Sequence, residues 1–165
     1  MEYSIVYSSN TGNTAMLAEV IREQVGSEKC KYFGSVDPKG KDTTLIFVGF
    51  WTDKGTCDEK MEEFLKSLRD KKVFIFGTAG FGGSEEYYSR ILKSVEKNLD
   101  VSNNIVGTYM CQGKMPVSIR NRYEKMMNET DDIKFKNLID NFDRAASHPN
   151  EDDFKEIRDM VKSLV

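Results

Sequence analysis

Short apolar runs recur along the chain, and most of them place hydrophobic residues on consecutive positions. The clear runs are Ile5–Tyr7, Leu45–Val48, Val73–Phe76 and Ile105–Tyr109, and a weaker one spans Cys30–Phe33. Consecutive apolar, β-branched and aromatic residues are typical of strands that are covered on both faces. The pattern therefore predicts five strands, of which the central ones are fully buried.

Helical patterns lie between these runs. Apolar residues recur there at intervals of three and four, which places them on one side of a helix. The three stripes are Leu17, Val20, Ile21 and Val25; Met61, Phe64, Leu65 and Leu68; and Ile91, Leu92, Val95 and Leu99. Strands that alternate with helices at this spacing predict right-handed βαβ units and an open, doubly wound parallel α/β sheet. We expect residues 1–165 to form a single domain.

The chain changes character after Pro116, where charged helical patterns take over and no further strand is evident. Two amphipathic stripes, within 135–142 and 154–164, predict extra C-terminal helices. Asn150 precedes the acidic turn of the second and is a plausible N-cap. We expect both stripes, together with Met126 and Met127, to pack on one face of the sheet; a surface that contacts a partner is the alternative.

The charge balance excludes some classes of function. The chain has 24 basic and 27 acidic residues, a net charge of −3, which argues against a nucleic-acid-binding protein. No apolar run is long enough to span a membrane, and the N-terminus lacks the pattern of a secretory signal. Three cysteines without a CxxC pair, and a single histidine, make a zinc site improbable. We expect a cytoplasmic monomer in which Cys57 and Cys111 are structural.

The first strand runs directly into a polar, glycine-containing loop of sequence SSNTGNT. In an open α/β sheet, ligands bind beyond the carboxyl ends of the strands, so the loop stands where a site is expected. A polar turn with a Ser or Thr helix cap would need one such residue, whereas this loop has several. Backbone approach at Gly12 and the following helix N-terminus favour an anion. Without a Walker lysine or a GxGxxG motif, the loop does not favour ATP or NAD.

Two further loops at strand ends carry aromatic residues. GFWTDKGTCD holds Trp51, the only tryptophan, and GTAGFGGSEE places four glycines around Phe81. Trp51 could cap the core, and the second loop could be a flexible segment that ends in the helix cap Ser84. Two aromatic residues beside a phosphate-binding loop nevertheless indicate a phosphorylated planar heterocycle.

These residues resemble a flavodoxin. IVYSSNTGNT matches the strand and phosphate loop of that family, and GFWTDKG and FGTAGFGG occupy the places of the two loops that enclose the isoalloxazine ring of FMN. The resemblance covers roughly residues 3 to 115. It implies a flavodoxin-like sheet of order 2-1-3-4-5, a short-chain type with extra C-terminal helices, and non-covalently bound FMN.

The resemblance also implies a role for particular residues. Trp51 and Phe81 would cover the two faces of the ring. The peptide between Lys54 and Gly55 would turn its carbonyl toward N5–H of one-electron-reduced flavin. The residues that would hold the phosphate are Ser9, Asn10, Thr11, Gly12, Asn13 and Thr14, and those near the ring would be Trp51, Thr52, Asp53, Gly55, Thr78, Ala79, Gly80, Phe81, Gly82, Gln112 and Gly113.

Two functions remain open at this point. The first is an electron carrier that exchanges electrons with partner redox proteins, and the second is an FMN-dependent reductase of a small molecule. No residue set in the loops forms a convincing proton-transfer pair, and His148 reads as a helix-end residue, so the carrier is favoured. Lys54, Lys114, Arg120 and Arg122 would make the rim basic, which predicts a less reducing flavin or an anionic partner or substrate.

Overall fold

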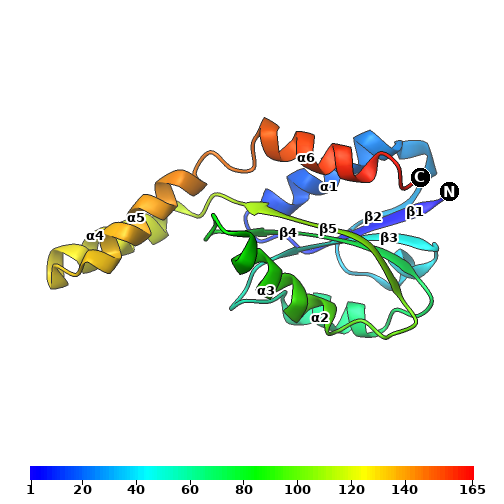
Figure 1. Ribbon diagram of the computed structural model, residues 1–165, viewed down its shortest axis with the longest axis horizontal. Coiled ribbons are helices and arrows are strands. Elements are labelled where there is room, and N and C mark those ends of the chain that lie inside the picture. The colour runs from blue at the N-terminus through cyan, green and yellow to red at the C-terminus, as the bar shows by residue number, and fades with distance from the viewer.

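Five parallel strands form one sheet in the order β2-β1-β3-β4-β5 (Figure 1). The computed structural model describes residues 1–165. The strands are β1 (Tyr3–Tyr7), β2 (Cys30–Gly34), β3 (Leu45–Trp51), β4 (Lys72–Ala79) and β5 (Asn104–Gln112). All five predicted strands are confirmed, and so is the predicted order, in which the topology reverses between β1 and β3.

Helices cover both faces of the sheet. α1 and α6 lie on one face, and α2 and α3 lie on the other (Figure 1). The segment between β2 and β3 contains only the short 3-10 turn η2 (Pro38–Lys41), and another, η1 (Ser27–Lys29), precedes β2. The six α-helices are α1 (Asn13–Val25), α2 (Glu59–Lys66), α3 (Glu85–Glu96), α4 (Val117–Thr130), α5 (Ile133–Ala145) and α6 (Glu151–Val161).

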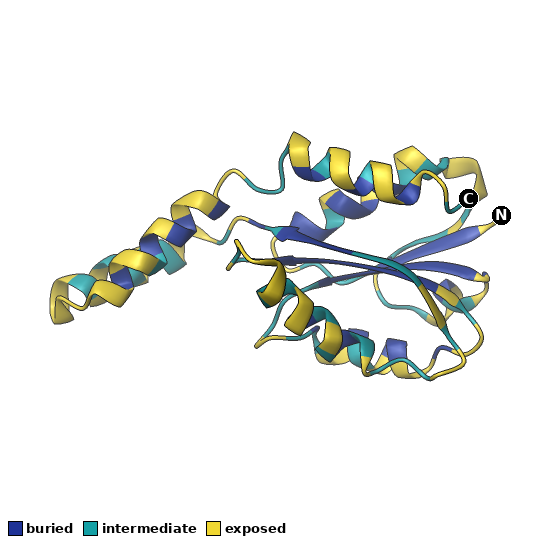
Figure 2. Ribbon diagram, in the orientation of Figure 1, coloured by how far each residue is buried: buried dark blue, intermediate teal, exposed yellow.

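The core consists of two apolar clusters, one on each face of the sheet. Phe47 of β3 is fully buried in one of them, with its ring centroid 5.5 Å from that of Tyr3 and 5.6 Å from that of Phe74. Figure 2 shows that burial runs along the central strands. The consecutive apolar positions in the sequence therefore reflect a sheet that both helical layers cover.

Side-chain caps fix the start of four helices. Ser84 Oγ accepts a hydrogen bond from the Tyr87 amide at the start of α3. Asn150 accepts from the amides of Asp152 and Asp153, and Asp153 returns a bond to the Asn150 amide, which completes a capping box for α6. Both predicted caps are confirmed. Asp58 and Asp132 cap α2 and α5 with a single side-chain bond each, which they accept from the amides of Met61 and Lys134.

The C-terminal helices differ from the expectation in one respect. Ile157 and Val161 of α6 are buried against the sheet and α1, as predicted. The expectation was wrong for α4 and α5, which pack against each other and project from the body as a helical hairpin (Figures 1 and 2). Phe135, Ile139 and Phe142 are buried there and belong to neither core cluster, because the hairpin supplies its own apolar interface.

None of the six helices combines the length and the apolar character that a membrane-spanning segment requires.

Candidate functional site

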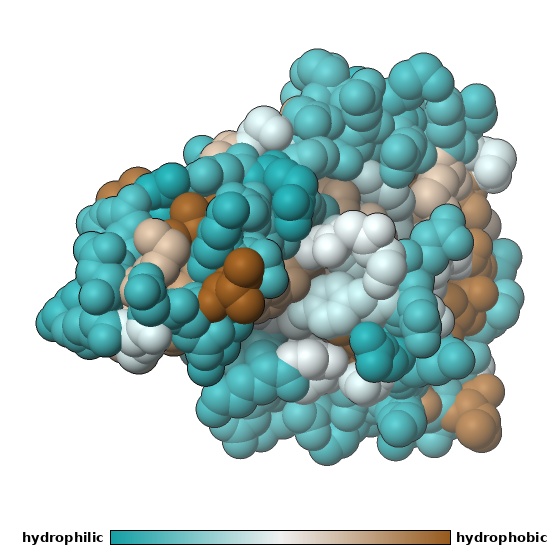
Figure 3. All heavy atoms as spheres, turned by 60° about the vertical axis from the view of Figure 1, so that its left-hand side comes forward, coloured by the Kyte–Doolittle hydropathy of each residue, from teal (hydrophilic) through white to brown (hydrophobic).

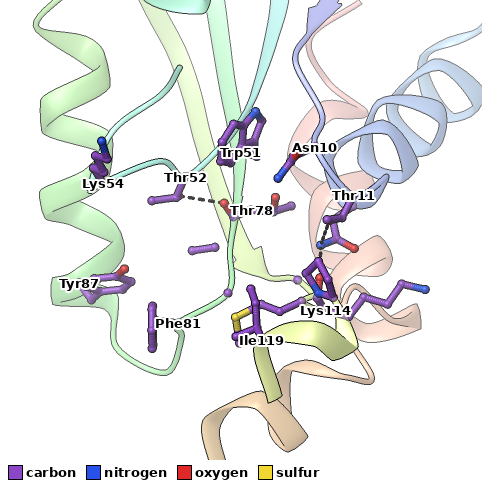
Figure 4. Close-up of a pocket in the computed structure, with 17 residues that line it drawn as sticks. Asn10, Thr11, Trp51, Thr52, Lys54, Thr78, Phe81, Tyr87, Lys114 and Ile119 are labelled. Atoms are coloured by element: carbon purple, nitrogen blue, oxygen red, sulfur yellow. Dashed lines mark hydrogen bonds between the residues drawn. The ribbon is translucent and has the colours of Figure 1, made fainter. Parts of the chain in front are cut away.

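A pocket of about 350 Å³ opens at the carboxyl ends of the central strands (Figure 4). This volume lies within the range of pockets that bind small ligands or cofactors. Its position is the one expected for a ligand in an open α/β sheet, because loops from neighbouring parallel strands meet there. The pocket is lined by Asn10, Thr11, Asn13, Trp51, Thr52, Lys54, Gly55, Thr78, Ala79, Gly80, Phe81, Tyr87, Gly113, Lys114, Met115, Pro116 and Ile119.

The polar loop after β1 contributes Asn10, Thr11 and Asn13 to the pocket. It leads into α1, whose N-cap residue Gly12 has a φ of 93° and makes no side-chain cap. Ser9 Oγ accepts a hydrogen bond from the Gly12 amide at 3.2 Å. Because the first turn of α1 carries no acidic residue, its free N–H groups and positive dipole end suit an anion.

Asn13 joins this loop to the segment after β5. Its Nδ2 donates to Thr11 Oγ1 at 3.1 Å and to the Lys114 carbonyl at 2.9 Å. Gly113 packs so closely on Asn13 that a Cβ atom there would lie 2.5 Å from Nδ2. Asn13 Oδ1 is buried and has no partner in the protein, so it can accept a hydrogen bond from a ligand hydroxyl.

Two hydroxyl groups of the same loop are engaged inside the protein. Thr14 is fully buried, and its Oγ1 donates to the Phe50 carbonyl at 3.0 Å and lies 3.0 Å from Thr78 Oγ1. Ser8 Oγ donates to Asp58 Oδ2 at 2.8 Å, which links the first loop to the cap of α2. The Thr14 hydroxyl therefore connects α1 to the ends of β3 and β4.

The end of β3 and the loop that follows it place Trp51 and Thr52 against the pocket (Figure 4). Thr52 donates to the Thr78 carbonyl from both its amide and its hydroxyl, each at 2.9 Å. A tight turn follows, closed by reciprocal backbone bonds between Asp53 and Thr56. Lys54 and Gly55 at its centre both have positive φ, 51° and 83°, as a type I′ turn requires. Only these two residues of the turn line the pocket.

The loop after β4 forms the opposite side of the pocket. Phe81 is 42% exposed and lies across the pocket from Trp51, with Tyr87 of α3 behind it (Figure 4). Gly82 does not line the pocket, because it faces Gln112: a Cβ atom at Gly82 would lie 2.7 Å from Gln112 Cδ. Gln112 itself supports the loop from behind, where its Nε2 donates to the Gly80 carbonyl at 3.1 Å.

The last wall comes from the α4–α5 hairpin and the segment that leads into it. Met115, Pro116 and Ile119 line the pocket although the sequence analysis did not select them. Met115 packs on Gly80, where a Cβ atom would lie 2.6 Å from Met115 Sδ. The signal available in the sequence was their position, directly after the fourth clear strand end, but no residue type there indicated a ligand.

The structure brings eleven of the seventeen predicted site residues to the pocket wall: Asn10, Thr11, Asn13, Trp51, Thr52, Gly55, Thr78, Ala79, Gly80, Phe81 and Gly113. Ser9, Gly12, Thr14, Asp53, Gly82 and Gln112 lie in the same loops but do not line it. Their assignment as ligand contacts, like that of the others, stays a prediction.

The thiols take no part in the site. Cys57 and Cys111 are buried, and neither lines the pocket. Burial raises the pKa of the Cys57 thiol to about 11 and that of Cys111 further. Burial therefore disfavours the thiolate, the reactive form of cysteine, at both positions.

A family model described as "Flavodoxin domain" matches residues 4–162, almost the whole chain. The chain belongs to the flavodoxin family. The predicted resemblance is thereby confirmed, and it extends beyond residue 115 to include the hairpin and α6.

A curated relative is similar to the chain in sequence, and two solved structures are similar to it in fold. The chain is 36% identical over 185 aligned residues to the "Flavodoxin-like domain-containing protein BilS" of Clostridium symbiosum (strain WAL-14163), with 100% of this chain and 96% of that protein covered. Its fold is similar to that of a Streptococcus pneumonia TIGR4 flavodoxin, with a TM-score of 0.60, 14% identity and coverage of 99% and 97%. It is also similar to a flavoprotein from Lactobacillus acidophilus NCFM solved in complex with FMN, with a TM-score of 0.52, 16% identity and coverage of 66% and 92%.

Proposed function

We propose that this flavodoxin-family chain binds FMN non-covalently and carries electrons between partner redox proteins. The observation that supports it best is the convergence of three loops on one pocket: the polar loop at the start of α1, the Trp51 loop and the Phe81 loop. The Lactobacillus acidophilus flavoprotein, which shares the fold, is described as an FMN complex.

The residues of the pocket fit this cofactor. The start of α1 with Asn10 and Thr11 would hold the phosphate, and Trp51 and Phe81 would enclose the ring. Asn13 Oδ1, a buried acceptor without a partner, would receive a hydrogen bond from a ribityl hydroxyl. When bound, FMN supplies the one- and two-electron chemistry, and the protein contributes binding, orientation and electrostatics.

The pocket favours a carrier over a small-molecule reductase. Among the residues that line it, the titratable side chains are Lys54, Tyr87 and Lys114, and there is no carboxylate, imidazole or thiol. The wall thus lacks the carboxylate, imidazole and thiol groups that most often move a proton to or from a bound substrate.

A binding and reduction experiment tests the proposed function. The purified protein is expected to bind FMN in a titration followed by Trp51 fluorescence. It is expected to bind riboflavin about tenfold or more weakly, because riboflavin lacks the phosphate that would accept charge-assisted hydrogen bonds at the start of α1. Stepwise photoreduction followed by absorbance is then expected to show two separate one-electron steps. Equal binding of both ligands would contradict the phosphate loop. Direct two-electron bleaching, together with NAD(P)H oxidation by the protein alone, would favour the reductase.

The rim of the pocket supports a partner with an acidic surface. Lys54 and Lys114 line the pocket, and Arg122 lies one helical turn beyond Ile119; all three are exposed and form no ion pair. Arg120, also expected in this rim, is instead engaged with Asp143 and Glu124. The hairpin surface is mostly hydrophilic away from the pocket and carries hydrophobic side chains next to it (Figure 3), a mixture that suits a transient contact steered by charge.

Charge reversal of the rim provides a prediction. In Lys54→Glu/Lys114→Glu, the two-electron potential of the bound flavin is expected to become more negative by on the order of tens of millivolts, because added negative charge disfavours reduced anionic flavin. Reduction by dithionite, an anionic reductant, is expected to slow and to lose its decrease with rising salt. Potentiometry and stopped-flow absorbance measure the two effects.

The matched control is Lys29→Glu/Lys72→Glu, which makes the same change in net charge at the amino ends of β2 and β4, where both lysines are exposed. It is expected to behave like the wild type. Equal effects in both double variants would show that only net charge matters and would remove the argument for a basic rim.

A further inference from the structure

Asn141 is a buried polar residue of α5, the second helix of the hairpin that projects from the body of the protein. Asn141 is 8% exposed, and its Nδ2 donates to the Gly80 carbonyl at 3.1 Å. Its Oδ1 accepts a hydrogen bond from Gln112 Nε2 at 3.1 Å. Burying an amide is costly unless it is hydrogen-bonded, so a buried asparagine with both ends paired is a specific contact.

The Gly80 carbonyl and the side-chain amides of Gln112 and Asn141 are hydrogen-bonded to one another. Gly80 O accepts from Gln112 Nε2 as well as from Asn141 Nδ2, each at 3.1 Å. The residues from Gly80 to Gly83, which carry Phe81, take part in no backbone–backbone hydrogen bond. At the Gly80 carbonyl, two side chains therefore hold the start of this loop, and one of the two donors belongs to the hairpin.

An ion pair within the hairpin links Asn141 on α5 to the residues of α4 that line the pocket. Arg120 of α4 donates from Nε to Asp143 Oδ1 at 2.8 Å and from a second nitrogen to Asp143 Oδ2 at 3.1 Å, and it also pairs with Glu124. Asp143 lies two residues beyond Asn141 on α5. Because the ion pair joins α4 to α5, the wall at Pro116 and Ile119 and the amide of Asn141 are parts of one unit.

We propose that Asn141 is a positioning residue of the flavin site: by holding the Gly80 carbonyl, it keeps the Phe81 loop closed on the ring. The α4–α5 hairpin thus helps to position the loop that would cover one face of the ring. The inference rests on the proposed function for its ligand, but the ordering of the loop by Asn141 is a property of the protein alone.

The test uses two variants and a matched control. Asn141→Asp keeps the size and the acceptor for Gln112, and it replaces the donor to Gly80 with an oxygen that repels the carbonyl. Asn141→Ala removes both bonds. Asn137→Ala is the control, because Asn137 is exposed one turn earlier on the same helix and makes no side-chain hydrogen bond.

Two measurements are made on the full-length protein. Without FMN, ¹⁵N relaxation is expected to show order parameters at Gly80, Gly82 and Gly83 that fall toward the flexible range, below about 0.6, in both Asn141 variants but not in the control. FMN affinity is expected to fall about tenfold in both, the effect of losing roughly one hydrogen bond. The visible circular dichroism of bound flavin is expected to change as the Phe81 loop shifts.

The outcomes separate the two proposals. Wild-type order parameters and affinity in Asn141→Asp would overturn the role of Asn141. If Asn141→Ala unfolds the hairpin, as a thermal melt would show, Asn141→Asp decides the question. Failure of the wild type to bind FMN would overturn the proposed function, whereas the order parameters without ligand would still test the contact.

Discussion

Gly113→Val is expected to lower FMN affinity about 100-fold, the equivalent of about 2.7 kcal/mol. A Cβ atom at this position would lie 2.5 Å from Asn13 Nδ2 and 2.9 Å from Asn13 Cγ, closer than atoms can approach. The Gly113 amide is at the same time held to the Ala79 carbonyl at 2.9 Å, so the backbone cannot easily withdraw. Asn13 would have to move.

Displacement of Asn13 affects both sides of the pocket. Its bonds to Thr11 Oγ1 and the Lys114 carbonyl would break, and the start of α1 would shift relative to the segment after β5. We expect the free energy of unfolding to fall by about 1–3 kcal/mol as well, the usual cost of overpacking.

Fluorescence titration and chemical denaturation measure the two effects of Gly113→Val. Gly113→Ala is expected to show the same changes to a smaller extent. Ser118→Val, which adds the same side chain at an exposed position of α4, serves as the control. Unchanged FMN affinity in Gly113→Val would contradict the placement of Asn13 in the binding site.

Trp51→Ala is expected to weaken FMN binding by roughly 5- to 150-fold, since stacking of a planar heterocycle on an aromatic side chain contributes about 1–3 kcal/mol. Trp51 ends the buried strand β3, which fixes its position, and it lines the pocket. Phe81 is 42% exposed, and its ring is smaller than an indole and purely apolar, so it offers less stacking surface to the flavin. We therefore expect Phe81→Ala to have the smaller effect.

Flavin fluorescence compares these variants, because Trp51→Ala removes the only tryptophan. Trp51→Phe, which keeps an aromatic ring, is expected to recover most of the affinity. A larger loss in Phe81→Ala than in Trp51→Ala would show that the rigid strand end is not the main contact with the ring. Wild-type FMN affinity in Trp51→Ala, Trp51→Phe and Phe81→Ala would show that neither aromatic residue stacks on the ring.

Much of the pocket was predictable because of a general property of parallel sheets. Their strands all point the same way, so loops that are distant in sequence, such as those at Asn10, Trp51 and Phe81, must meet at one edge. Unusual loop composition could therefore be read as one site before any distance was known. The same argument did not extend to Thr14, whose hydroxyl is used inside the protein, since loop composition does not show which way a side chain points.

The hairpin shows where sequence patterns stop being sufficient. The stripe at Phe135, Ile139 and Phe142 correctly predicts a helix with one buried side, but periodicity does not say which element covers that side. Another amphipathic helix competes with the sheet, and here α4 covers it. Asn141 gives no signal at all, because a polar residue in a charged helix reads as exposed.

The sequence by itself determined the five strands, their parallel direction, the helices that cover the sheet and the loops that form the pocket, whereas the strand order was implied only by the resemblance to flavodoxins. These depend on local patterning and on the common direction of the strands. Only the tertiary structure decided that α4 and α5 form a separate hairpin, and that Asn141 reaches the Gly80 carbonyl 61 positions away in the chain. Such contacts follow from how whole elements pack, and packing is selected by the combined fit of many side chains rather than by the pattern of any one segment.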